Sequence, residues 1–303
     1  MKTVAIVGMG HVGAATAFNL GINNTVTKIV CLGNTKDKVV AQVRDLEDGF
    51  TLAGSKTKVV VGNYSKLEDV DIVVITASAT LKHGQSRLDA FVDNKLVMEN
   101  IVDKCNAGGF KGIYIVASNP VDVMTAVVHK HSGFETNKVI GSGTILDNVR
   151  FKLELSKELN IDYKFIECNA IGEHGASIDL LFSTTKINGQ FLEEYLEQNS
   201  IVISHDKIIE TVIRKGPEIH KAKGTTEFGI AISISKIVEA IANDSHSQLL
   251  VTNYDSRYNL FIPNLFKIGK EGVVSRQPIA LSKFEVDIYE KSVSVLKQYQ
   301  DKL

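Results

Sequence analysis

Short, uninterrupted apolar runs alternate with longer segments of helical periodicity in the first half of the chain. Apolar runs of this length without a polar face are typical of strands buried on both sides. The predicted strands are residues 4–7, 28–32, 71–76 and 112–116, and the predicted helices are residues 12–20, 36–46, 88–105 and 121–131. This alternation predicts an α/β fold in which helices cover both faces of a doubly wound parallel sheet.

The pattern changes after about residue 141. Helical and strand-like stretches are mixed there, as in the run 180–185, and this favours a mixed α+β arrangement. Near the end of the chain, Ser282 and Glu285 have the spacing of a capping box, and apolar residues then recur at helical spacing as far as Leu296. The sequence therefore predicts a first domain of residues 1–142 and a second of residues 143–303.

Composition and charge narrow the class of protein. The chain has 303 residues, of which 44% are hydrophobic and 23% charged, and its formal net charge is −1. This balance argues against nucleic acid or an anionic membrane surface as a partner. The cysteines are widely spaced and form no CxxC pair, which favours a reducing compartment and gives no sign of a metal site. No apolar stretch is long enough to cross a bilayer, so we expect a cytoplasmic protein.

A glycine-rich turn follows the first predicted strand. Gly8, Gly10 and Gly13 form a GxGxxG pattern that opens the first predicted helix. Glycines permit a tight turn and let backbone N–H groups approach a pyrophosphate, and the helix N-terminus adds partial positive charge. The pattern alone is weak evidence, and a purely structural turn is the alternative. Its place between a strand and a helix favours a dinucleotide-binding Rossmann domain. His11 and Val12, which lie within the same turn, are also predicted to contact the cofactor.

The end of the second predicted strand leaves the form of the cofactor open. An acidic residue about 20 positions past the glycines usually binds the adenosine ribose of NAD. That position is Gly33 here. Asn34 and Thr35 could donate hydrogen bonds to a 2′-phosphate, and Lys36 or Lys38 could supply positive charge, which favours NADP. A site that binds NAD less tightly, beside solvated lysines, is a nearly equal alternative.

Five polar side chains are candidates for chemistry: Arg87, Asn119, Asp147, Arg150 and His174. Each has an ordinary structural interpretation when taken alone. Asp147 could belong to a helix cap, and Arg150 could be exposed on the same helix. Asn119 and His174 could be turn residues, and Arg87 a solvated loop charge. Their joint occurrence after a dinucleotide loop is what favours catalysis.

Together these stretches resemble the lactate/malate dehydrogenase family over nearly the whole chain. The order of the motifs and the 24-residue step from Arg150 to His174 are as in that family. The matching pieces are Gly8-x-Gly10-x-x-Gly13, Gly84-x-x-Arg87, Ser118-Asn119-Pro120, Asp147-x-x-Arg150, Gly172-Glu173-His174-Gly175 and Lys223-Gly224-Thr225-Thr226. Residues 118–123 and 141–144 are also similar to bacterial L-2-hydroxyisocaproate dehydrogenases, on the lactate-dehydrogenase-like branch of the family.

The resemblance implies a role for each candidate. His174 would be the acid–base group, and Asp147 would orient it and stabilise its imidazolium form. Arg150 would bind the substrate carboxylate as a bidentate fork. Arg87 would polarise the substrate carbonyl from a closing loop, and Asn119 would hydrogen-bond the same oxygen.

Further candidates surround these residues. The resemblance implies that Thr226 lines the substrate pocket and that Ile230, one turn later, packs on the nicotinamide. Thr76 and Ala77, at the end of the predicted strand 71–76, are candidate cofactor contacts, as is Asn119. The resemblance also implies a homotetramer or a homodimer.

One position bears on the substrate. In this family the residue six before the loop arginine is Arg in malate dehydrogenases and commonly Gln in lactate dehydrogenases. It is Leu81 here, which cannot pair with a second carboxylate. We therefore expect pyruvate or a larger branched 2-oxo monocarboxylic acid, over a broad range, since an apolar pocket discriminates by only about 1–3 kcal/mol per methylene. A malate dehydrogenase, NADP-linked or not, is the alternative, and a non-catalytic dinucleotide sensor is a remote one.

Overall fold

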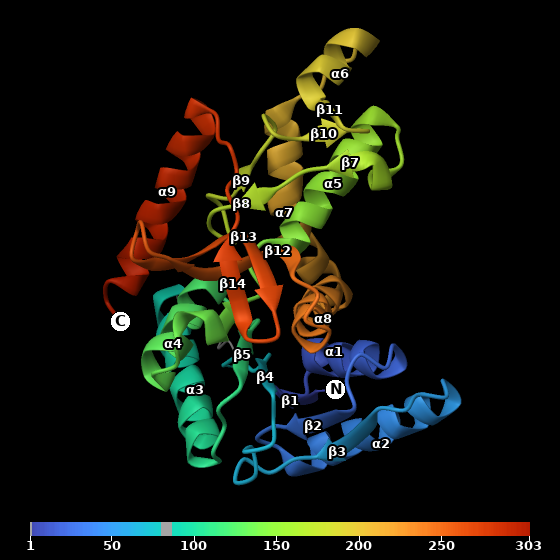
Figure 1. Ribbon diagram of the computed structural model, residues 1–303, viewed down its shortest axis with the longest axis vertical. Coiled ribbons are helices and arrows are strands. Elements are labelled where there is room, and N and C mark those ends of the chain that lie inside the picture. Colours follow the sequence, from blue (N-terminus) through green and yellow to red (C-terminus); the bar gives the residue numbers. More distant parts are fainter. Residues whose placement is uncertain (1, 80–86) are drawn as a thin grey trace.

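The computed structural model describes residues 2–79 and 87–303. These residues form a nine-stranded sheet in the order β14-β13-β12-β6-β5-β4-β1-β2-β3 (Figure 1). Neighbouring strands from β3 to β6 are parallel. They are β1 (Thr3–Val7), β2 (Lys28–Leu32), β3 (Lys58–Val61), β4 (Ile72–Ile75), β5 (Ile113–Val116) and β6 (Val139–Gly141). The strand order runs outward in both directions from β1, which is the predicted doubly wound arrangement.

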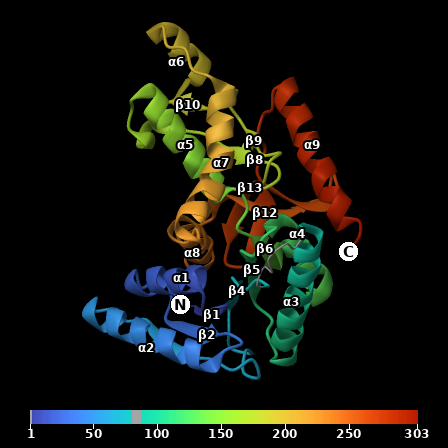
Figure 2. The same ribbon diagram turned by 180° about the vertical axis from the view of Figure 1, so that it is seen from behind.

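Helices cover both faces of this sheet. Helices α3 and α4 pack on each other, while α1 packs on α2 and α8, and Figures 1 and 2 show the two groups on opposite sides. The first-half helices are α1 (His11–Ile22), α2 (Lys36–Leu52), α3 (Arg87–Ala107) and α4 (Val121–Ser132). A one-turn helix, η1 (Thr136–Lys138), precedes β6.

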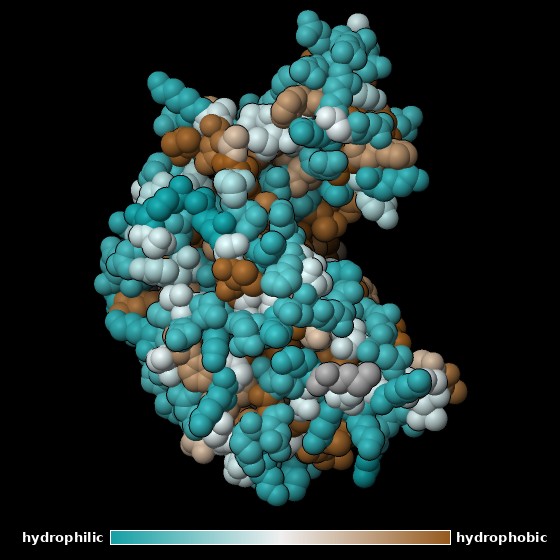
Figure 3. Space-filling view, in the orientation of Figure 1, coloured by the Kyte–Doolittle hydropathy of each residue, from teal (hydrophilic) through white to brown (hydrophobic). Residues whose placement is uncertain are grey.

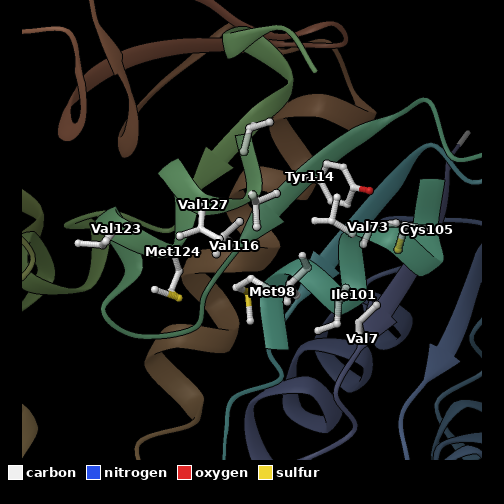
Figure 4. Packing of buried hydrophobic residues seen from close by; sticks show 14 of the residues in the cluster. Val7, Val73, Met98, Ile101, Cys105, Tyr114, Val116, Val123, Met124 and Val127 are labelled. Carbon is white, nitrogen blue, oxygen red and sulfur yellow. The ribbon is translucent and has the colours of Figure 1, made fainter. Parts of the chain in front are cut away.

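The alternation of side chains along β1 divides the core into two clusters. Ala5 and Val7 face a cluster that includes α3 and α4, part of which is seen in Figure 4. Val4 and Ile6 face a second cluster built with α1, α2 and α8. Because successive strand residues point to opposite faces, a strand covered on both sides has to be apolar throughout, which is the reason the short apolar runs are diagnostic.

The second half of the chain extends the same sheet and adds a separate body of helices and short strands. β12 runs antiparallel to β6 and β13, and β13 runs antiparallel to β14. The larger elements are α5 (Ile145–Leu159), α6 (Leu192–Asn199), α7 (His205–Lys223), α8 (Phe228–Ala242), β12 (Ser247–Asp255), β13 (Leu260–Gly269), β14 (Gly272–Arg276) and α9 (Lys283–Gln300). The short ones are η2 (Tyr163–Phe165), β7 (Ile166–Glu167), β8 (Ala170–Ile171), β9 (Asp179–Leu180), β10 (Lys186–Ile187) and β11 (Gln190–Phe191).

Every element predicted in the first half is confirmed in type. β2 has the predicted bounds, and the others are shifted at one or both ends. The largest shift is in α2, which continues to Leu52. The closing helix α9 is also confirmed, with its capping box: Glu285 N–H donates to Ser282 Oγ, and Ser282 N–H donates to the Glu285 carboxylate. Of the nine strands in this sheet, β3, β6 and β12 to β14 are not predicted from the pattern.

The run 180–185 belongs to a strand only at its first residue. Only Asp179 and Leu180 pair with β8. The chain then turns, with the Thr185 N–H donating to the Phe182 carbonyl. Within the described part of the chain, no helix has both the length and the apolar character needed to cross a membrane.

Candidate active site

The glycine-rich turn between β1 and α1, residues 8–13, leaves backbone N–H groups uncovered by side chains, and we call it the cradle. Gly8 has φ +104°, and a Cβ there would lie 2.6 Å from the backbone N of Ala77. A Cβ on Gly13 would lie 2.0 Å from the carbonyl oxygen of Gly8. A Cβ on Gly10 would meet nothing within 4 Å. Two glycines are thus required by close packing, and the third leaves open the space where a ligand can approach the start of α1.

A cavity of about 520 Å³ runs from this cradle along the carboxyl ends of the parallel strands. That is the place where doubly wound sheets bind ligands, and the volume is typical of cofactor sites. The predicted cofactor contacts that line it are Gly8, Gly10, Gly33, Asn34, Thr35, Thr76 and Ala77, and Lys38 lines it too. Tyr64 and Asn100 also line the cavity, and no local sequence motif predicts a role for either residue. The donor-rich cradle and the length of the cavity fit a dinucleotide.

Six predicted cofactor contacts are not among the residues that line this cavity: Gly13 of the glycine turn, Asn119, and the four described next. His11 is exposed at the start of α1, with Nδ1 3.3 Å from a carboxylate oxygen of Glu227. Val12 is half-buried beside it. Lys36 is exposed at the first position of α2, and Ile230 packs on the core from α8.

Gly33 follows β2 next to the glycine turn, since the Gly8 N–H donates to the Leu32 carbonyl at 2.9 Å. Among the described residues that line the cavity, no carboxylate occurs, and Lys38 carries a positive charge. Asn34 and Thr35 are exposed there. A Cβ on Gly33 would lie 2.9 Å from Cγ2 of the buried Val39, so a larger side chain requires Val39 to shift. The surroundings therefore present donors and a cation where a ribose-binding acid is usual.

The structure brings three of the candidate catalytic side chains together. Asp147 lies in the first turn of α5, 6% exposed, and Arg150 lies one turn later, 8% exposed. Arg150 donates from Nη1 to Asp147 Oδ1 at 2.9 Å. The other oxygen, Oδ2, lies 2.5 Å from Nδ1 of His174, which is on the loop between β8 and β9. Because Asp147 holds Nδ1, the remaining ring nitrogen Nε2 is the one available for proton exchange.

The same contacts set the protonation of the site. Burial alone would lower the pKa of His174, but the Asp147 carboxylate outweighs it, and the pKa is raised to about 9. Burial likewise opposes ionisation of Asp147, yet the charges of His174 and Arg150 hold its pKa below its ordinary value. His174 is therefore cationic near neutral pH and can donate a proton.

Asn119 is exposed at the end of the connection from β5, before a cis peptide bond to Pro120. Its carbonyl accepts from Nδ2 of Asn94 at 3.1 Å, and Asn94 Oδ1 accepts from the Ala79 N–H at 2.7 Å. These two hydrogen bonds connect the start of α4 to Ala79, the last described residue before position 80.

Two other candidate site residues follow in the chain. Leu81 lies outside the described residues, and Arg87 is described only by its backbone, as the first residue of α3.

The remaining candidate for the substrate pocket, Thr226, is half-exposed between α7 and α8. Helix α7 also passes close to the Arg150 guanidinium, since a Cβ on Gly216 would lie 3.3 Å from two of its nitrogens. Thr144 does not cap α5, because its hydroxyl donates to the Ala170 carbonyl at 2.5 Å. The helix-cap interpretation of this stretch is therefore wrong, and the buried Asp147 is used by His174 instead.

A parallel sheet with a dinucleotide cradle, beside a buried histidine–aspartate–arginine set, defines an oxidoreductase that uses a nicotinamide dinucleotide. Residues 2–141 match the lactate/malate dehydrogenase NAD-binding domain, and residues 144–303 match the α/β C-terminal domain of the same family. The chain belongs to the lactate/malate dehydrogenase family.

Individual relatives are similar over the full length. The L-lactate dehydrogenase of Borrelia hermsii is 36% identical over 308 residues, which is 99% of this chain and 98% of the relative. The ligand-bound minor L-lactate dehydrogenase of Enterococcus mundtii has a TM-score of 0.96 at 31% identity, covering 100% of this chain and 98% of the other. A malate dehydrogenase from Cryptosporidium parvum has a TM-score of 0.91 at 27% identity, covering 100% and 98%. Both branches of the family therefore share this fold.

Proposed function

We propose that this chain is an L-2-hydroxyacid dehydrogenase of the L-lactate dehydrogenase type, acting reversibly on a 2-oxo monocarboxylic acid. The observation that carries the proposal is the linked set His174–Asp147–Arg150, in which one buried carboxylate binds both an acid–base group and a cation. A nicotinamide dinucleotide, bound along the cavity from the Gly8–Gly13 turn, would supply or accept the hydride at its C4 atom.

The side chains divide the work of binding and proton exchange. Arg150 carries a charge close to His174 and binds the substrate carboxylate, which fixes the carbonyl carbon in a near-attack position. During reduction, His174 Nε2 donates its proton to the carbonyl oxygen, and during oxidation it removes the hydroxyl proton. Asp147 stabilises the imidazolium before the transfer. Arg87 and Asn119 are assigned to the same carbonyl oxygen.

A plate of initial rates tests the proposed substrate class. We expect kcat/KM for pyruvate or 4-methyl-2-oxopentanoate to exceed that for oxaloacetate by at least about tenfold, since an unpaired second carboxylate is costly to bury against leucine. The plate crosses the three acids with NADH and NADPH. A preference for oxaloacetate would refute the assignment and support a malate dehydrogenase, as which some similar structures are named. No turnover on any acid would support the non-catalytic sensor.

We also propose that the cofactor site accepts NADPH as well as NADH, because Gly33 at the end of β2 offers no carboxylate and Lys38 of α2 also lines the cavity. Replacing Gly33 with Asp is expected to raise the NADH-to-NADPH ratio of kcat/KM by about 100-fold. Two like charges about 4 Å apart near a surface repel by roughly 1–4 kcal/mol, and the new carboxylate can accept from the ribose hydroxyls.

Gly33→Ala is the matched control, because its Cβ meets Val39 in the same way without adding charge. Its ratio should stay within about threefold of wild type. If crowding at Val39 unfolds the Asp variant, the same ratio can be measured in Gly33→Asp combined with Val39→Ala. An unchanged ratio in a folded Asp variant would mean that Gly33 does not face the adenosine ribose.

We further propose that the chain forms a homodimer or homotetramer. Large apolar side chains are exposed on three helices, namely Phe18 on α1, Val149 on α5, and Phe228 and Ile232 on α8. Figure 3 shows apolar side chains in an indentation of the molecular surface. Sedimentation equilibrium measures the subunit number, and a monomer at micromolar concentration would refute this. The division into domains 1–142 and 143–303 and the cytoplasmic location stay predictions.

A further inference from the structure

The loop that carries His174 is held by its backbone from two sides. It connects β8 to β9, and both figures of the ribbon show these strands between α9 and α7 (Figures 1 and 2). The Glu173 N–H donates to Ser292 Oγ of α9 at 3.1 Å, and the His174 N–H donates to Asp122 Oδ2 of α4 at 2.8 Å. A buried N–H is costly to leave unpaired, so each of these acceptors restricts the path of the loop.

On one side, Asp122 joins three separate elements. It lies in the first turn of α4, only 2% exposed, directly after the segment that carries Asn119. Its Oδ1 accepts from Thr252 Oγ1 of β12 at 2.5 Å, while its Oδ2 accepts from His174. Burial raises the pKa of Asp122 to about 6 against these hydrogen bonds, so the group is largely ionised at pH 7.5. A carboxylate in the first turn of a helix is also favoured by the helix dipole.

On the other side, Ser292 reaches the loop from α9. It is fully buried, accepts from the Glu173 N–H, and donates to the Ser177 carbonyl. Glu173 then closes the loop on itself, because its carboxylate accepts from the Ser177 hydroxyl at 2.5 Å and from the Ser177 N–H at 3.2 Å. A Cβ on Gly172 would lie 2.5 Å from Ser292 Oγ, so the hydroxyl fits directly against the turn that precedes His174.

We propose that Asp122 and Ser292 are positioning residues for His174. Each accepts a hydrogen bond from the backbone of its loop, while Asp147 fixes the ring. This rests on the acid–base role assigned to His174 in the proposed function. Helices α4, α9 and α5 each contribute one of the three groups. With both the backbone and the ring fixed, Nε2 keeps its direction toward the substrate, which is the requirement for a near-attack geometry.

Asp122 also contributes charge. The charged groups that face His174 are Asp147 and Arg150 from α5 and Asp122 from α4. The two carboxylates favour the imidazolium, and the guanidinium opposes it; Glu173, on the loop itself, acts on Asp122. Asp122→Asn keeps an oxygen that can accept from the His174 N–H but removes this charge. Asp122→Ala removes both, so the two variants separate geometry from electrostatics.

The experiment measures kcat, KM and the His174 pKa in these variants. Asp122→Ala should lower kcat by about 100-fold with KM changed much less, because a displacement of about 1 Å at a reacting group costs about that factor. Asp122→Asn should restore kcat to within about tenfold of wild type. Both variants should lower the His174 pKa, read by ¹H–¹⁵N NMR of the imidazole without substrate. Ser292→Ala should lower kcat by about tenfold.

Thr125→Ala is the control for Asp122. Thr125 is a fully buried residue on the same helix, and its hydroxyl donates to the Val121 carbonyl instead of to Asp122 or the loop. This variant should lower thermal stability with kcat and the His174 pKa unchanged. Wild-type kcat and His174 pKa in folded Asp122→Ala would overturn the proposal. If Asp122→Ala does not fold, the pKa in Asp122→Asn and the kcat of Ser292→Ala decide it.

The NMR titration also separates this proposal from the proposed function. A wild-type chain that reduces no 2-oxo acid, but whose His174 pKa falls on replacing Asp122, would refute the proposed function and support the contact between Asp122 and His174 on which the positioning depends.

Discussion

Replacement of His174 by Asn is expected to lower kcat by about 10³-fold while NADH affinity stays within a factor of a few. General acid–base catalysis contributes roughly 10²–10⁴-fold, and Asn can still bind the carbonyl oxygen but cannot exchange a proton with it. The cofactor cavity is built from other elements, so its affinity should not change. Fluorescence titration with NADH measures binding, and stopped-flow or steady-state rates with pyruvate measure turnover.

The dependence on pH has a defined sign. The Asp147 carboxylate overcomes burial and raises the pKa of His174 to about 9. Reduction requires the imidazolium, so kcat/KM for the 2-oxo acid should fall as the pH rises through about 9. Oxidation requires the neutral ring, so kcat/KM for the hydroxy acid should rise over the same range. In the His174→Asn variant, neither kcat/KM value should change with pH over this range.

His220→Asn is a matched control, because that histidine is exposed on α7. Its rates and pH profile should equal those of wild type. Turnover of His174→Asn within a factor of a few of wild type, with the pH dependence retained, would assign the acid–base role to another group.

Replacement of Asp179 by Asn is expected to stabilise the protein at pH 8, on the order of 3 kcal/mol. Asp179 is 1% exposed on β9, and among the described residues neither of its carboxylate oxygens has a hydrogen-bond partner. Burial, with the nearby charge of Glu285, raises its pKa to about 7. A shift of about three units from the ordinary value corresponds to roughly 4 kcal/mol between the two protonation states.

The sign follows from proton linkage. Between an unfolded pKa of about 4 and the folded pKa of about 7, the folded state holds a proton that the unfolded state has lost, so stability falls as the pH rises through this window. Above pH 7 the whole penalty is present. The Asn variant carries no such charge, so its gain should be large at pH 8 and small at pH 5. Thermal unfolding midpoints at both pH values, at one protein concentration, measure this; a gain of at least about 4 °C is expected at pH 8.

Asp255→Asn is the control with the opposite sign. Asp255 is also buried, on β12, but it forms ion pairs with Arg257 and Arg276. Burial alone would raise the pKa of Asp255, but these arginines hold it below the ordinary value. Its replacement removes the buried carboxylate that pairs with both arginines and should destabilise the protein at pH 8. Equal midpoints for wild type and Asp179→Asn at pH 8 would show that Asp179 is solvated or paired in solution.

The sequence by itself determined the features that depend on near neighbours. Short apolar runs indicate strands covered on both sides, and apolar residues at helical spacing indicate helices. The local pattern therefore predicts four of the parallel strands, β1, β2, β4 and β5, and the helices α1 to α4. The glycine turn follows too, because its chemistry is contained in six residues between a strand and a helix. The capping box of α9 is equally local, and it forms as its spacing indicates.

Only the tertiary structure decided how distant segments meet. The His174 N–H finds its acceptor on Asp122, 52 residues away, and the Glu173 N–H finds Ser292, 119 residues away. No periodicity encodes such pairs, because they depend on how α4 and α9 pack around one loop. The same holds for β12, which joins the parallel sheet beside β6, and for Asp179, whose polarity suggests exposure while packing buries it. Local sequence selects elements, whereas burial and long-range hydrogen bonding are set by their packing.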